Sequence, residues 1–142
     1  MYTGLLHAHH WLRYIALILL LVSIIKAIVD LKHKGEAVTG RKVALYSLIA
    51  VHLQLITGLI LFFMSPKVEM AMENMGMAMK DPASRLVLIE HPLMMIIGII
   101  LITVGYRKSK SITDRAKYGK TILVYFGIAL LLILSRIPMY SW

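Results

Sequence analysis

Histidines stand inside long apolar runs of this 142-residue chain, where ionisable side chains are costly. His52 lies near the middle of one run, and His91 lies in another. Three more histidines open the first apolar run: His7, His9 and His10. Neutral imidazole is an axial ligand of haem iron, and a pair of imidazoles makes an electron-transfer centre. The pattern therefore predicts a redox metal centre inside a helix bundle, with haem b as the cofactor.

Depth along the expected helices decides whether these histidines can meet. At 1.5 Å per residue, His52 lies ~18 Å and His91 ~14 Å below the outer ends of their helices, and His9 lies about 9–10 Å down. These depths overlap, so we expect three helices to bring histidines to one site, as bundles do for cofactors. A lone histidine in a membrane helix often only bonds helices together. Three at similar depth favour a bound metal or haem.

Residues around the histidines fit a flat, charged cofactor. Arg13 lies four residues after His9 on the same helical face and is expected to neutralise a haem propionate. Gly98 lies seven residues after His91, so the backbone there could approach a cofactor closely. Pro92 cannot donate a backbone hydrogen bond, and we expect a kink beside His91. Spacing alone does not tell which histidine pair binds.

Composition places these residues in a lipid bilayer. The hydrophobic fraction is 59% and the mean hydropathy +0.77, above the ~45–50% apolar share of globular domains. The excess lies in four blocks near the ~20 residues that a membrane helix needs. We expect helices over residues of about 4–31, 42–64, 82–106 and 117–137. The predicted fold is all-α, a four-helix transmembrane bundle that forms one membrane domain over residues 1–142.

The net charge of +9 comes from cations in two short loops between apolar runs. This clustering indicates membrane topology, and we expect no nucleic-acid partner. The positive-inside rule puts both loops in the cytoplasm and both termini outside, in the bacterial inner membrane. Pro138 should end the fourth helix, with Tyr140 and Trp142 as interfacial anchors. Because the chain has no cysteine, it holds no disulfide, thiolate site or thioether-attached haem.

The segment 67–81 is rich in methionine and is expected to form an outer loop. Its thioethers belong to Met70, Met72, Met75, Met77 and Met79. Thioether sulfur is a soft donor that selects Cu(I), although a methionine-rich segment can equally be an adaptable surface on the membrane. One alternative function is therefore copper binding or transport through this loop and the internal histidines. Another is a non-haem metal enzyme in which Glu90 joins the histidines.

Several short motifs, spread over nearly the whole chain, are similar to small bacterial four-helix membrane proteins of the cytochrome b type. They are His7-Ala-His9, Leu12-Arg13, Val51-His52-Leu53-Gln54-Leu55, Ser65-Pro66-Lys67 and Glu90-His91-Pro92-Leu93-Met94. The resemblance implies a b haem held by helix histidines and electron transfer at the membrane. Its first-helix spacing favours His7 and His9 over His10, and the methionine-rich segment is not part of it.

The favoured function is therefore a b-type cytochrome that passes electrons from quinol to a periplasmic partner. His52 and His91 are the leading ligand candidates, followed by His9 and then by His7 and His10. A homodimer with a haem between the protomers stays open.

Overall fold

The computed structural model describes residues 2–137, and every regular element in that range is a helix. Four spans are long and apolar enough to cross a membrane. They are α1 (Tyr2–Leu31), α2 (Arg41–Met64), the span Pro82–Lys110 and α7 (Arg115–Ser135). The third span comprises α5 (Pro82–Arg85), the π-helical turn η1 (Leu86–Glu90) and α6 (His91–Lys110). These helices confirm the all-α prediction and indicate a multi-pass membrane protein.

The helix boundaries lie within a few residues of those predicted. The third span runs on to Lys110 rather than to about residue 106. The fourth helix begins at Arg115 rather than near residue 117, because the Asp114 side chain accepts a hydrogen bond from the Lys117 amide and caps the helix earlier. The predictions for Pro138, Tyr140 and Trp142 fall outside the described residues.

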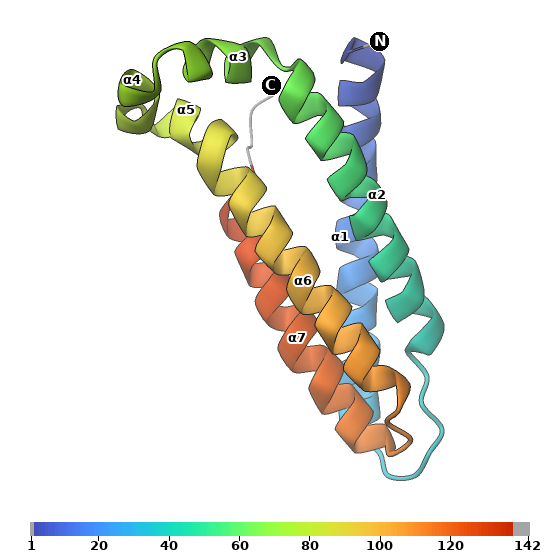
Figure 1. Ribbon diagram of the computed structural model, residues 1–142. Coiled ribbons are helices and arrows are strands. Elements are labelled where there is room, and N and C mark those ends of the chain that lie inside the picture. Colours follow the sequence, from blue (N-terminus) through green and yellow to red (C-terminus); the bar gives the residue numbers. More distant parts are fainter. Residues whose placement is uncertain (1, 138–142) are drawn as a thin grey trace.

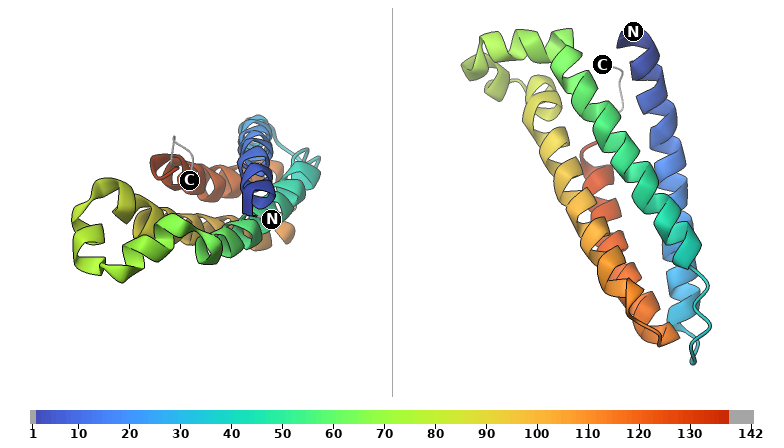
Figure 2. Two further views of the ribbon diagram at one scale, coloured as in Figure 1. Left: turned by 90° about the horizontal axis from the view of Figure 1, so that it is seen from above. Right: turned by 45° about the vertical axis from the view of Figure 1, so that its right-hand side comes forward.

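Successive long helices run in opposite directions (Figure 1). α1 packs along both α2 and α7, and α6 packs along α7, whereas α2 and α6 contact one another less extensively. The views in Figure 2 show α1 beside α2 and α6 beside α7. α1 and α6 therefore lie diagonally across the bundle. The two connections at residues 32–40 and 111–114 share one end, which we call the loop end.

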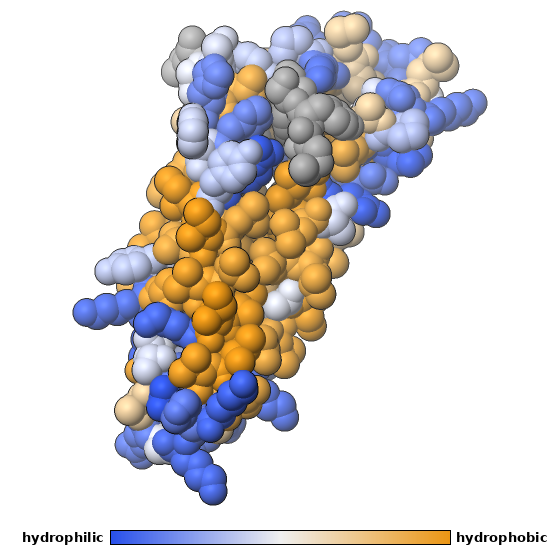
Figure 3. Space-filling view, turned by 180° about the vertical axis from the view of Figure 1, so that it is seen from behind, coloured by the Kyte–Doolittle hydropathy of each residue, from blue (hydrophilic) through white to orange (hydrophobic). Residues whose placement is uncertain are grey.

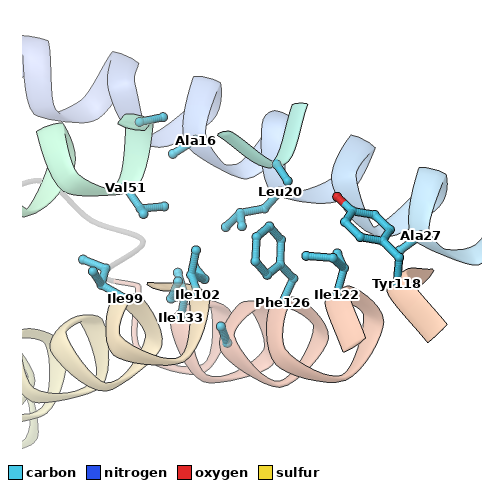
Figure 4. Close-up of a cluster of buried hydrophobic side chains, with 13 residues drawn as sticks. Ala16, Leu20, Ala27, Val51, Ile99, Ile102, Tyr118, Ile122, Phe126 and Ile133 are labelled. Carbon is cyan, nitrogen blue, oxygen red and sulfur yellow. The ribbon is translucent and has the colours of Figure 1, made fainter. Parts of the chain in front are cut away.

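The core of the bundle is apolar and lies mainly between α1 and α7. Leu20 of α1 and Phe126 of α7 are almost completely buried and point toward one another (Figure 4). Many large apolar side chains instead lie on the outer faces of the helices. Seen from behind, they form a hydrophobic belt between hydrophilic ends (Figure 3). Such a belt is what contact with lipid requires.

Glycines set the distance between several helix pairs. A Cβ atom on Gly119 would lie 2.3 Å from the Ala27 carbonyl oxygen, so α7 touches the backbone of α1 there. A Cβ atom on Gly98 would lie 2.9 Å from Ile133 Cγ1. Gly98 thus admits a side chain of α7, and not the flat cofactor expected from its spacing to His91.

The third span is irregular directly before His91, close to where we expected a kink. Residues 86–90 form a π-helical turn, and the His91 amide donates to the Leu86 carbonyl five residues back. Pro92 follows and offers no amide hydrogen. Such wide turns are frequent at functional sites. Here the turn precedes the histidine that enters the bundle.

The predicted loop over residues 67–81 is largely helical. It forms α3 (Pro66–Glu73) and α4 (Met75–Lys80), which with α5 make a segment that bends away from the bundle and that we call the cap (Figure 1). The correction has a local cause, since each short helix has an N-terminal side-chain cap. The caps are Ser65 to the Val68 amide, Asn74 to the Met77 amide and Asp81 to the Ser84 amide.

A buried ion pair fastens the loop end. Arg115 Nε lies 2.7 Å from Asp30 Oδ1, and the Asp30 side chain is 0% exposed. The amide and hydroxyl of Thr39 also donate to this carboxylate. Arg41 donates to the carbonyl oxygen of Ser109 at 3.0 Å and so joins α2 to α6. The helices are therefore tied together at this end.

Candidate functional site

A pocket lies between the four long helices in the half of the bundle nearer the cap. The pocket is open on one side, with a cavity volume of about 90 Å³ and an empty space, including open solvent, of about 910 Å³. The wall is mostly aliphatic, and its polar side chains are those of His9, His10, Arg13, Gln54 and His91. The limited contact between α2 and α6 leaves room for it.

The pocket brings together two predicted ligands, His9 from α1 and His91 from α6. His91 Nδ1 lies 2.8 Å from the Arg136 carbonyl oxygen. A carbonyl only accepts, so Nδ1 carries the proton and Nε2 the lone pair. Metal-bound histidines are usually oriented in this way, with the second ring nitrogen donating to a carbonyl or carboxylate.

His9 is only 8% exposed and is held in the same tautomer by α2. Its Nδ1 lies 3.1 Å from Thr57 Oγ1. The Thr57 hydroxyl donates its own hydrogen to the Gln54 carbonyl oxygen at 3.1 Å. Thr57 must therefore accept from His9, and the lone pair of His9 lies on Nε2. Two imidazoles on diagonal helices are thus both prepared to act as Nε2 donors.

Gln54 is a pocket residue that the sequence reasoning missed. Its Nε2 donates to the His9 carbonyl oxygen at 2.9 Å, which fixes the orientation of the amide. Its Oε1 is buried and has no hydrogen-bond partner in the described part of the chain. An unpaired buried acceptor costs about 1–3 kcal/mol, so a donor from water or a guest molecule is expected there. An amide within an apolar run was the available signal.

The structure does not bring His52 or His7 to this pocket. His52 is exposed on the outer side of α2, and its Nδ1 donates to the Leu48 carbonyl at 2.8 Å. Ile49 and Ile56, which lie one turn away from His52 on either side, are exposed as well. His7 is exposed on α1, whereas His10 lines the pocket. The role of His52 as a ligand stays a prediction.

Among the other charged candidates, Arg13 lines the pocket, and its guanidinium donates to the Tyr14 hydroxyl at 3.1 Å. Glu90 lies outside the pocket wall and is held by Arg85 at 3.1 Å and by Arg136 at 3.8 Å. Within residues 2–137, no group of three or more His, Cys, Asp or Glu could hold a metal ion. The geometry thus does not unite Glu90 with the histidines.

Comparison with protein-family models, with curated proteins and with solved structures found no match for this chain. The resemblance to small membrane cytochromes b therefore rests on the sequence motifs alone.

The donor set of the pocket fits a haem better than a free metal ion. Two Nε2 donors on opposite helices suit axial ligation, the aliphatic wall suits a macrocycle, and Arg13 suits a propionate. The cavity volume of about 90 Å³ is too small for a haem. The cofactor would have to use the wider space that opens beyond it.

Proposed function

We propose that this protein is a b-type cytochrome of the bacterial inner membrane that carries electrons through a haem held by His9 and His91. The observation that carries the proposal is that buried His9 and half-buried His91 both line the pocket and are each hydrogen-bonded through Nδ1. Each donates through Nδ1, which leaves Nε2 as the ligand atom. A bound haem b would supply reversible one-electron chemistry.

The chain itself would tune that chemistry in three ways. The Thr57 hydroxyl and the Arg136 carbonyl would hold the ligand rings in orientation. The aliphatic wall would limit water around the iron, which helps to set its potential. Arg13 would pair with a propionate at the pocket wall.

Quinol is the electron donor that we propose, with a periplasmic protein as the acceptor. A quinol hydroxyl donates a hydrogen bond, and the buried Gln54 Oε1 has no such donor among residues 2–137. The basic loop end would face the cytoplasm by the positive-inside rule. Reduction of the pigment by a soluble quinol analogue is the check, and a pigment that only dithionite reduces would remove quinol from the proposal.

The deciding experiment is an optical spectrum of the detergent-purified protein, first air-oxidised and then reduced with dithionite. We expect a sharp Soret band and narrow bands on reduction, as for a six-coordinate b haem. His9→Ala and His91→Ala should each abolish this spectrum, because each removes a side chain that would hold the haem. His52→Ala is the matched control and should leave the spectrum intact, since His52 lies outside the pocket.

Two results would contradict the proposal. A colourless protein from cells that supply haem would exclude the cytochrome function. A pigment that survives both His9→Ala and His91→Ala, yet is lost in His52→Ala, would move the haem to the outer face of α2.

A further inference from the structure

The cap encloses a second hollow, separate from the histidine pocket. It measures about 600 Å³ and lies among α3, α4, α5 and the start of η1. No residue lines both sites. The proposed haem function makes no use of the cap or of its methionines.

The structure divides the five cap methionines into two groups. Met70 of α3 and Met77 of α4 both line the hollow, so two short helices each bring one methionine to the same space. Met72, Met75 and Met79 do not line it. Met70 is 70% and Met77 66% exposed, so neither sulfur is enclosed by protein packing.

The oxygen atoms beside these sulfurs are already engaged. Asn74 Oδ1 accepts from the Met77 amide and caps α4. Asp81 Oδ2 accepts from the Ser84 amide and hydroxyl, and these hydrogen bonds lower the pKa of the Asp81 carboxyl. Both of these oxygens serve the short helices, whereas the two thioethers are the soft donors of the hollow. Thioether donors of this kind suit a soft cation such as Cu(I) better than a hard cation such as magnesium.

We propose that the cap hollow binds one Cu(I) ion through the sulfurs of Met70 and Met77. Asn74 ends α3 and caps the N-terminus of α4, so it joins the two methionine-bearing helices beside the hollow. The site does not depend on the haem, because it shares no residue with the histidine pocket.

The test is a titration of the detergent-purified full chain with Cu(I), in competition with the chromophoric chelator bicinchoninate. The wild type should withdraw about one Cu(I) per chain. The double variant Met70→Leu and Met77→Leu should lose both ligand atoms. Its Cu(I) affinity should therefore fall by more than the roughly 10- to 100-fold that follows loss of an outer-shell partner. The triple variant Met72→Leu, Met75→Leu and Met79→Leu should bind as the wild type does. Leucine and methionine have similar volumes, so the cap should keep its fold.

Three outcomes would overturn the proposal. The first is that the wild type fails to compete for Cu(I), as expected if the methionines only contact the membrane surface. The second is that the triple variant loses as much affinity as the double variant, which would mean that the number of methionines, and not their place at the hollow, determines binding. The third is that His9→Ala abolishes Cu(I) binding, which would place the ion in the histidine pocket. Because the readout is copper and not pigment, it is independent of the haem proposal.

Discussion

At His9, the hydrogen bond of Nδ1 to Thr57 determines what the other ring nitrogen can do. Thr57 can accept from Nδ1 only because its own hydrogen is used on the Gln54 carbonyl. Had the hydroxyl donated to Nδ1 instead, the proton would lie on Nε2 and ligation would be blocked. A chain of two hydrogen bonds within α2 thus sets the tautomer of a side chain on α1.

These two hydrogen bonds, from His9 to Thr57 and from Thr57 to Gln54, predict that Thr57→Val weakens haem binding. Valine matches threonine in shape but cannot accept from Nδ1, so the ring loses its orientation and the affinity should fall by roughly 10- to 100-fold. Thr103→Val is the control, because Thr103 donates to the Ile99 carbonyl of its own helix and does not line the pocket. Haem titration of both apoproteins, followed at the Soret band, is the measurement. Equal affinities would show that Thr57 does not orient His9.

The pocket histidines on α1 and α6 were predictable from the sequence, but the side of α2 that faces the pocket was not. His52 and Gln54 are two residues apart and therefore about 200° apart around the helix. Because α2 is apolar on all sides, its pattern does not mark the face that the bundle covers. Ligand chemistry favoured His52, whereas packing turned Gln54 inward. Only the positions of α1 and α6 decide between them.

At the scale of helices, the α1–α7 contact depends on the absence of a side chain at Gly119. A Cβ atom there would also lie 2.5 Å from the Leu31 amide nitrogen, so both close neighbours are backbone atoms that cannot move aside. Helix ends were predictable because proline and capping residues mark them locally. Close contacts between helices were not predictable, since Gly119 looks no different in sequence from Gly127. A Cβ atom added at Gly127 would have no neighbour within 4 Å among the described residues.

The two glycines of α7 therefore form a matched pair. Gly119→Ala should destabilise the bundle by about 1–3 kcal/mol, the usual effect of overpacking. Gly127→Ala should be neutral or stabilising by up to about 1 kcal/mol, because alanine favours a helix and meets no neighbour. Unfolding in detergent, followed by circular dichroism, compares the two. Equal stabilities would mean that α1 and α7 are not in backbone contact at this point.

Over the whole molecule, the two ends of the bundle differ in construction. The loop end is fastened by the Asp30–Arg115 pair and by Arg41, whereas the cap end holds the pocket. Asp30 and Arg115 are 85 residues apart, so no local pattern linked them. Removing one partner of such a buried pair usually costs about 3–5 kcal/mol. The firmly tied end of the bundle therefore lies opposite the end that holds the pocket.

This polarity makes the orientation in the membrane testable, and the absence of cysteine makes the test clean. Glu73→Cys places an exposed thiol on the cap, and Ser111→Cys places one at the loop end. A membrane-impermeant maleimide applied to intact spheroplasts should label Glu73→Cys at once and Ser111→Cys only after lysis, because the cationic loops stay in the cytoplasm. The cysteine-free wild type is the control. Labelling of Ser111→Cys before lysis would reverse the orientation, placing the histidine pocket and the methionine cap toward the cytoplasm and excluding a periplasmic electron acceptor.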